Sequence, residues 1–409
     1  MSPRRASLLL GLVLLAFAAG LRDRPAHAGG GAPAPKEIAT PGALGAKAPS
    51  LTVLPDGRVL MSWIEPRAAG GVALRCATLG GGQWSSPATI AEGDSVLGNW
   101  ANFPVVQALG GNRLAVSWLW MRPGGSEACD VRVSQSEDGG RNWSDPVTTH
   151  RDATPTEHGF ASLVARPEGA LAVWLDGRKT VGHQEGDLGP APDMTLRAAV
   201  VTPDGRLADE AELDERVCDC CQTAAVATAR GVVVAYRDRS PAEVRDIAVV
   251  RLQGGQWTEP SVAHRDGWHL DGCPVNGPAL AARGSRVALA WYTAAADSPK
   301  VLLAFSDDDG ATFGRPVRID EGEPAGRVHL TMLEDGGALV VWLEQQGQET
   351  VVRARRVGPA GVPDAPFTVA GAAAVRGFPR VARSGKTLVF AWTTPAKPPR
   401  LRTATATLR

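Results

Sequence analysis

Four cysteines in two short segments carry the most distinctive chemistry of this sequence. Three lie in Cys218-Asp219-Cys220-Cys221, and Cys273 follows 52 residues after Cys221, just beyond His269. Adjacent cysteines do not bond to each other without distorting the peptide between them, so Cys273 is a natural disulfide partner for one of the cluster. Thiolates together with an imidazole would instead suit Cu(I) or Zn(II). The sequence leaves open disulfide staples, a redox switch, and a copper or zinc site made of Cys218, Cys220, Cys221, His269 and Cys273.

Charged residues at the ends of short apolar runs form a second set of candidates. Leu175-Asp176-Gly177-Arg178 and Tyr236-Arg237-Asp238-Arg239 each end such a run, which would aim their charges at a shared pocket. A carboxyl group can act as an acid or a base, and a guanidinium can hold a carboxylate through two hydrogen bonds. The ordinary alternative is a set of solvated Asp–Arg pairs, which stabilise a protein little. The candidate acids are Asp176, Asp238 and Asp271, and the candidate ligand-binding residues are Arg178, Arg237, Arg327, Arg380, Glu157 and His158.

The first 28 residues have the features of an export signal. Arg4 and Arg5 precede an apolar run from Leu8 to Ala19, and Ala26-His27-Ala28 is a small-x-small cleavage site, so we expect a cut after Ala28. No later stretch is apolar for long enough to span a bilayer. The mature protein is therefore expected in the periplasm or outside the cell, where six cysteines favour disulfides first and metal second.

The charge balance limits the possible partners. Lys and Arg together number 43, as do Asp and Glu, so the net charge is zero. This balance argues against binding nucleic acid or an anionic membrane through bulk electrostatics. The expected partner is a small-molecule or glycan ligand. The oligomeric state cannot be read from the sequence.

A repeated aromatic position indicates the fold that must hold these residues. Apolar strand-like runs contain Trp63, Trp118, Trp174, Tyr236, Trp291, Trp342 and Trp392, at intervals of 50 to 62 residues. Short strands between Gly-rich turns with this period are typical of propeller blades. The sequence predicts an all-β, seven-bladed β-propeller of four-stranded antiparallel blades over residues 36–409, after a linker at 29–35. The last unit lacks a fourth strand, and residues 37–40 could supply it and so close the ring.

Two copies of one motif support this fold and suggest a family. Residues 136–143 and 306–313 both read Ser-x-Asp-x-Gly-x-x-aromatic, an order suited to a tight turn between antiparallel strands. The motif resembles the Asp-box of sialidase-like propellers with bacterial neuraminidase repeats, which usually have six blades, so six blades are the alternative count. Its structural residues here are Ser136, Asp138, Gly140, Trp143, Ser306, Asp308, Gly310 and Phe313.

The resemblance implies an exo-sialidase-like pocket with particular parts. In that family three arginines hold the substrate carboxylate, a tyrosine assisted by a glutamate is the nucleophile, and an aspartate is the acid/base, in departure from the usual carboxylate pair. Tyr292 is the candidate nucleophile here, because Tyr236 occupies the repeated Trp position. The family's Arg-Ile-Pro motif is missing, and the nearest segment is Gly377-Phe378-Pro379-Arg380.

The expected loop arrangement places these candidates on one face. In a four-stranded meander, the links between blades and the loops between second and third strands share the face opposite the Asp-boxes. The leading expectation is an exported sialidase-like propeller that binds a sialoside-like carbohydrate in a Cys/His-rich axial pocket, with possible glycoside hydrolysis. The alternatives are a periplasmic copper-binding protein and a protein-interaction platform with disulfide-stapled loops.

Overall fold

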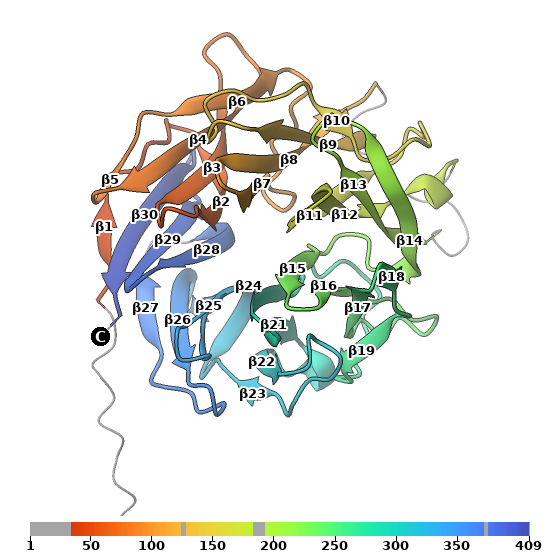
Figure 1. Ribbon diagram of the computed structural model, residues 1–409. Helices are drawn as coiled ribbons and strands as arrows, with labels where there is room; N and C mark the ends of the chain where they lie inside the picture. The colour runs from red at the N-terminus through yellow and green to blue at the C-terminus, as the bar shows by residue number, and fades with distance from the viewer. Residues whose placement is uncertain (1–33, 124–127, 183–192, 372–374, 409) are drawn as a thin grey trace, which may run out of the picture. The chain divides into compact units, whose positions relative to one another are not determined.

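The described residues of the computed structural model form seven antiparallel β-sheets, which are the blades of a ring (Figure 1). They are residues 34–123, 128–182, 193–371 and 375–408, and residues 32–409 make one compact unit. The expected signal peptide at 1–28 and the linker residues 29–33 lie outside them. The predicted all-β propeller with seven blades is confirmed, and the six-bladed alternative is wrong.

The first four blades follow one another along the chain. Blade 1 consists of β2 (Lys47–Val53), β3 (Val59–Pro66), β4 (Val72–Gly80), β5 (Gln83–Trp84) and β6 (Ala88–Gly93). Blade 2 consists of β7 (Val105–Gly110), β8 (Arg113–Met121), β9 (Cys129–Ser136) and β10 (Val147–Thr148). Blade 3 consists of β11 (His158–Arg166), β12 (Gly169–Asp176), β13 (Met194–Val201) and β14 (Leu207–Val217). Blade 4 consists of β15 (Ala224–Thr228), β16 (Gly231–Arg237), β17 (Ile247–Gln253), β18 (Gln256–Trp257) and β19 (Ser261–His264).

The remaining blades complete the ring. Blade 5 consists of β20 (Ala279–Arg283), β21 (Arg286–Thr293), β22 (Lys300–Ser306) and β23 (Val317–Arg318). Blade 6 consists of β24 (Glu323–Met332), β25 (Ala338–Gln346), β26 (Glu349–Val357) and β27 (Phe367–Ala370). Blade 7 consists of β28 (Arg376–Ser384), β29 (Thr387–Thr394), β30 (Arg400–Thr407) and β1 (Lys36–Ile38).

Strand β1 joins the start of the described chain to its end. It pairs antiparallel with β30, with Lys36 opposite Thr405 and Ile38 opposite Thr403. This pairing is the ring closure that the sequence predicts. It covers the outer edge of β30, which would otherwise present unpaired backbone groups to solvent.

The core lies between neighbouring blades. The second strand of each blade is largely buried, and every residue of β12 is buried. Because blades cover both faces of such a sheet, these strands are continuous apolar runs and do not alternate with polar residues. Trp63, Trp174, Trp291 and Trp342 have exposed fractions of 0%. The repeated Trp position is therefore a packing position.

The two Ser-x-Asp-x-Gly motifs form the turns between the third and fourth strands of blades 2 and 5. The Ser136 hydroxyl donates to Asp138 at 2.9 Å and accepts from the Gly140 N–H at 2.9 Å. Ser306, Asp308 and Gly310 make the equivalent contacts at 2.7 and 2.9 Å. The pKa of Asp138 is lowered to about 2, mainly by hydrogen bonds from the backbone and side chain of Asn142. These residues build turns, as the sequence predicts.

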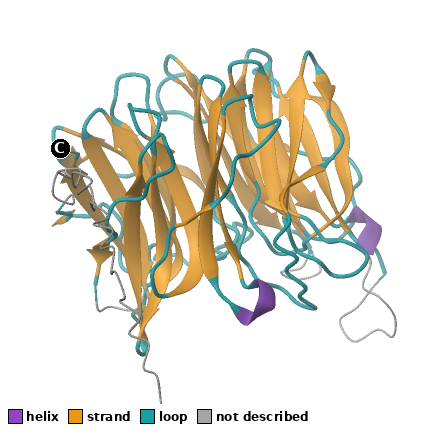
Figure 2. Ribbon diagram, turned by 90° about the horizontal axis from the view of Figure 1, so that it is seen from below, coloured by secondary structure: helices purple, strands orange, loops and turns teal. Residues whose placement is uncertain are grey.

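The opposite face, here called the site face, holds the links between blades and the loops between second and third strands. Both short 3-10 helices, η1 (Arg178–Thr180) and η2 (Ala295–Asp297), are loops of this kind and lie at the same end of the ring (Figure 2). With three residues each, neither of these helices of the described chain could cross a membrane.

The innermost strands are irregular where they begin at the site face. Their pairing with the second strand shifts register near Ala48 in β2, Phe160 in β11, Arg327 in β24 and Gly377 in β28. All four residues have positive φ, between 53° and 82°. Bulges of this kind re-aim side chains and are common beside functional sites. In this ring they recur around the axis, at the mouth of its central channel.

Candidate ligand-binding site

Two arginines and a phenylalanine from blades 6 and 7 lie together at the axis. The guanidinium carbon of Arg327 lies 5.1 Å from the ring centre of Phe378, and that of Arg380 lies 5.8 Å from it. Arg327 also lies 4.7 Å from the Trp100 ring, and Arg380 lies 3.7 Å from the Phe103 ring. Trp100 and Phe378 stack at an interplanar angle of 18°. Cation–π contacts therefore hold both guanidinium groups in place.

Neither guanidinium has an acidic partner among the described residues, where no carboxylate oxygen lies within 4.0 Å of Arg327 or Arg380. Arg327 donates to the carbonyl of Val275, and Arg380 donates to the carbonyl of Pro49 at 3.2 Å. The terminal Nη2 of Arg380 is buried without a hydrogen-bond partner. Burial lowers the pKa of Arg327 to about 10 and that of Arg380 to about 9. An anion that reached this place would satisfy an uncompensated charge.

A cavity of about 260 Å³ opens beside the Trp100–Phe378 stack, between blades 7 and 1. Its charged lining residues are Lys47, Arg376 and Lys397, and Trp100 forms part of its wall. Burial, and then the charge of Arg376, lower the pKa of Lys47. All charged groups among the described lining residues are cationic. We call Lys47, Trp100, Arg327, Arg376, Phe378 and Arg380 the axial cationic site.

The channel below this site runs between the innermost strands and has a volume of about 160 Å³. It is lined by Arg380, His329, Ser162 and Thr223, among other residues. The Nδ1 atom of His329 accepts a hydrogen bond from the backbone N–H of Val381 at 3.3 Å. Burial, and then the charge of Arg380, lower the pKa of His329 well below its ordinary value. The imidazole is therefore neutral, and Arg380 is the charged group of the channel.

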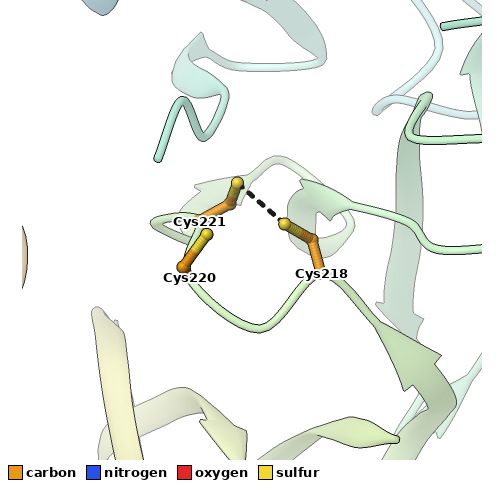
Figure 3. A group of neighbouring side chains, drawn as sticks. All are labelled: Cys218, Cys220 and Cys221. Atoms are coloured by element: carbon orange, nitrogen blue, oxygen red, sulfur yellow. Dashed lines mark hydrogen bonds between the residues drawn. The ribbon is translucent and has the colours of Figure 1, made fainter. Parts of the chain in front are cut away.

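The cysteine cluster lies on the links into blades 4 and 5. Cys220 and Cys273 form a disulfide. Cys218 and Cys221 keep their thiols, share a hydrogen bond with 3.0 Å between the sulfur atoms, and lie beside Cys220 (Figure 3). The predicted partnership of Cys273 with one member of the cluster is thus present. While this disulfide is present, Cys220 and Cys273 cannot act as the predicted metal ligands, because disulfide sulfurs are not thiolates. His269 is exposed and is not in the Cys218–Cys220–Cys221 group.

Arg237, another predicted ligand-binding residue, is committed to the backbone. Its Nε and Nη2 atoms donate to the carbonyl of Asn276, and Nη2 also donates to the carbonyl of Tyr292 at 2.7 Å. Its guanidinium lies 4.8 Å from the Trp268 ring, and Tyr292 packs edge-on against the same ring at 5.5 Å. Burial raises the pKa of Tyr292. Arg237 and Tyr292 thus join blades 4 and 5 beneath the site face.

Asp238 and Asp271, the predicted acids near this junction, lie in different surroundings. Burial, with the charges of Asp214 and Asp246, raises the pKa of Asp238 to about 6. Asp271 is exposed on the link that carries Cys273.

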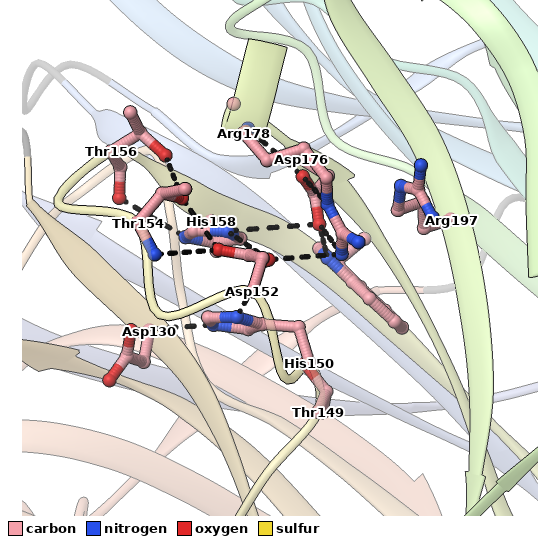
Figure 4. Close-up of polar contacts among 12 residues, drawn as sticks. Asp130, Thr149, His150, Asp152, Thr154, Thr156, His158, Asp176, Arg178 and Arg197 are labelled. Atoms are coloured by element: carbon pink, nitrogen blue, oxygen red, sulfur yellow. Dashed lines mark hydrogen bonds and ion pairs between the residues drawn. The ribbon is translucent and has the colours of Figure 1, made fainter. Parts of the chain in front are cut away.

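A separate buried network lies between blades 2 and 3 (Figure 4). The rings of His150 and His158 stack 3.6 Å apart, and Asp152 Oδ2 lies 3.1 Å from His150 Nδ1 and 3.2 Å from His158 Nε2. Arg178 Nη2 lies 3.1 Å from the same oxygen of Asp152 and 2.7 Å from Asp176. Burial opposes ionisation of Asp152, but hydrogen bonds from Thr154 and the neighbouring histidines hold its pKa below the ordinary value.

This network accounts for three more of the predicted residues. Asp176 and Arg178 lie together at the end of β12, as the strand-end pattern suggested, and His158 joins them, but the charged groups pair with one another. Asp176 is fully buried and also accepts from the Trp174 indole at 2.8 Å. Glu157 contributes its backbone carbonyl to the Gly177 N–H at 2.8 Å.

Of the residues predicted to bind a ligand, the structure thus brings Arg327 and Arg380 together, and the predictions did not include Lys47, Trp100 or Arg376. Lys47, Trp100 and Arg376 lie on links and strand starts that do not repeat from blade to blade. One signal was present for Trp100, because this tryptophan stands outside the repeated Trp position. A Trp that the blade pattern does not require is a candidate for ligand contact.

Comparison with known proteins shows that this chain shares its fold with solved structures at low sequence identity. No protein-family model and no curated protein matches the sequence. The BP39L lectin from Burkholderia pseudomallei is similar in structure, with a TM-score of 0.64 and 12% identity over 89% of this chain and 97% of the lectin. An ulvan lyase of polysaccharide lyase family PL25, bound to -[GlcA(1-4)Rha3S]-, has a TM-score of 0.58 and 10% identity over 91% of this chain and 96% of the lyase. The sialidase NanB from Streptococcus pneumoniae has a TM-score of 0.45 and 11% identity over 88% of this chain and 68% of that chain. The structural neighbours thus include lectins, polysaccharide lyases and sialidases, and what this chain shares with the first two is the propeller fold.

Proposed function

We propose that this protein binds an acidic glycan at the axial cationic site. The observation that carries the proposal is a pair of guanidinium groups that lie against the Phe378 ring without a carboxylate partner among the described residues. Arg380 is buried, with its Nη2 atom lacking a hydrogen-bond partner, and Arg327 is half-buried. Charges removed from water are normally paired with an opposite charge, so two guanidinium groups without a carboxylate partner favour an anionic ligand. Arginine suits this role because its fork can bind a carboxylate or sulfate through two hydrogen bonds.

The surroundings favour a sugar as the carrier of the anion. Trp100 offers an aromatic surface beside the cavity, and Lys47, Arg376 and Lys397 surround the opening with positive charge. Ligand sites commonly combine an aromatic wall with a few placed polar groups. Two proteins that share the fold are a lectin and an ulvan lyase bound to -[GlcA(1-4)Rha3S]-.

The site supports binding better than glycoside hydrolysis. The usual hydrolytic mechanism needs two carboxyl groups that flank the scissile bond, and the described residues that line the cavity include none. Asp176 is held inside the network of His158 and Arg178. We place the binding activity outside the cytoplasm because of the expected export signal at residues 1–28.

Calorimetric titration with paired oligosaccharides tests this proposal. A uronate- or sulfate-bearing oligosaccharide should bind, and its neutral counterpart of equal length should not. Arg380→Met should weaken binding roughly tenfold to hundredfold, because a hydrogen bond to a charged group contributes about 1.5–3 kcal/mol. Arg383→Met is the matched control, because Arg383 lies in the same strand and bonds to Met332 and Glu334. Equal binding of neutral and acidic sugars, or unchanged affinity in both Arg327→Met and Arg380→Met, would refute the proposal.

A further inference from the structure

The four clustered cysteines place a dithiol against a disulfide. The sulfur atoms of Cys218, Cys220 and Cys221 all lie within 4.8 Å of one another, and Cys220 is already bonded to Cys273. Cys218 and Cys221 are separated by two residues and their sulfurs by 3.0 Å, so a modest movement would join them.

The two pairs differ in their access to solvent. Cys218 and Cys221 have exposed fractions of 0% and 1%, whereas Cys220 is half-buried and Cys273 is exposed. The cluster therefore runs from a buried reduced pair to a surface oxidised pair. Small reagents in solution can reach Cys273 but not Cys218.

We propose that these four residues form an internal thiol–disulfide exchange site that carries two electrons from the buried pair to the surface pair. In the first step the Cys218 thiolate attacks the sulfur of Cys220. The Cys218–Cys220 bond forms, the Cys220–Cys273 bond breaks, and Cys273 leaves as a thiolate. Exchange of this kind proceeds through such a mixed disulfide.

The second step completes the transfer. The Cys221 thiolate attacks the sulfur of Cys218, the Cys218–Cys221 bond forms, and Cys220 leaves as a thiolate. The two protons that the buried thiols give up are taken by Cys220 and Cys273. The buried dithiol is oxidised and the surface disulfide is reduced, so the exchange balances without any outside reagent. Its product is an accessible dithiol on the site face, suited to reducing a disulfide of another molecule.

Trapping of Cys273 under native conditions tests the proposal. The folded protein is incubated with N-ethylmaleimide at pH 7.5, quenched with acid, digested without reduction and mapped by mass spectrometry. Because alkylation is irreversible, it draws the exchange forward even when the exchanged state is rare. We expect Cys273 to gain maleimide in step with the appearance of a Cys218–Cys221 linked peptide, in a 1:1 ratio.

Three variants separate the steps. Cys218→Ser should abolish labelling of Cys273, because it removes the attacking thiol. Cys221→Ser should still release Cys273 but should stop at a Cys218–Cys220 linkage. Cys76→Ser is the control and should label as the unmodified protein does, because Cys76 is a buried thiol in blade 1 outside the cluster.

Three outcomes would overturn the proposal. One is an unlabelled Cys273 in the unmodified protein after an incubation that fully labels the reduced and denatured protein. Another is labelling of Cys273 in Cys218→Ser at the unmodified rate. The third is a stoichiometric copper or zinc ion, found by elemental analysis, that protects Cys218 and Cys221 from labelling after denaturation, which would make the cluster a metal site. The measurement on the unmodified protein decides the matter even if a variant does not fold.

Discussion

The indole Nε1 of Trp174 donates a 2.8 Å hydrogen bond to Oδ2 of Asp176, two residues further along β12. The same relationship recurs in blades 1 and 6, where Trp63 donates to Glu65 at 2.7 Å and Trp342 donates to Glu344 at 3.0 Å. A buried indole N–H needs an acceptor, and an acid two residues away on the same side of the strand supplies one. In these three blades the relationship explains why an acidic residue follows the repeated Trp near the strand end.

Replacing Trp174 by Phe should destabilise the protein by about 1–3 kcal/mol, because the substitution removes one hydrogen bond from a buried carboxylate. Urea unfolding followed by circular dichroism measures the loss. Trp84→Phe is the control and should cost less, because its indole bonds at 3.3 Å to a neutral Thr403 hydroxyl in a partly buried place. Equal losses in the two variants would contradict the role given to the Trp–carboxylate pair.

The network of Asp130, His150, Asp152, His158 and Asp176 should make the fold sensitive to acid. The pKa values of the three carboxyls are lowered in the folded state, so their stabilising contribution is present above an unfolded value near 4 and is lost as the pH falls through the folded values. Burial also lowers the pKa of His158, so stability should begin to fall once the pH drops below about 6.5.

Asp152→Asn should remove much of this acid sensitivity. At pH 7 the variant should be less stable by about 3 kcal/mol, because it removes one charge from a buried group of ion pairs. At pH 3 the difference should shrink. Unfolding free energies at several pH values measure this, with Asp204→Asn as the control, because Asp204 pairs with Arg206 at an exposed turn. A pH-independent difference would contradict the assignment.

Asp238→Asn should stabilise the protein at neutral pH. The folded pKa of Asp238 is raised to about 6, above an unfolded value near 3.9, so this carboxyl costs stability as the pH rises from about 4 to 6. Because the group is partly exposed, we expect a gain of at most about 1 kcal/mol at pH 7.5 and no gain at pH 4. Thermal unfolding at the two pH values checks both statements. Destabilisation at pH 7.5 would show instead that the charged form is needed.

Removal of β1 should open the ring. A chain that begins at Ala39 loses the partner of β30 and should expose that strand edge, which lowers the unfolding temperature and promotes association. Size-exclusion chromatography and thermal unfolding measure the two effects. A chain that begins at Ala34 keeps β1 and should behave as the full domain does. A stable monomer without β1 would contradict the closing role of this strand.

The fold could be predicted from the sequence because its signals repeat. The Trp position, the Gly-rich turns and the Ser-x-Asp-x-Gly motifs each recur, and the unpaired strand at residues 37–40 matched the unit that lacked one. The residues of the candidate site could be named only in part from the sequence, because they do not repeat from blade to blade. Trp100 lies on a link and Lys47 begins β2, and the approach of Trp100 to Arg327 depends on bulges that no periodicity records.

The charges at strand ends show a second limit. From the sequence alone, Asp176, Arg178 and Arg237 are equal candidates for a pocket. In the structure each of them contacts a buried partner. Arg327 and Arg380 differ because aromatic rings, and not acids, surround them. Such a distinction depends on neighbours from other blades, which are distant along the chain.

The pairing of Lys36 with Thr405 means that the last sheet cannot be completed until β30 has left the ribosome, long after β1 has done so. A nascent chain in which translation stops before β30 would keep an unpaired first strand and an incomplete ring. The ring therefore closes only in a chain that carries both β1 and β30.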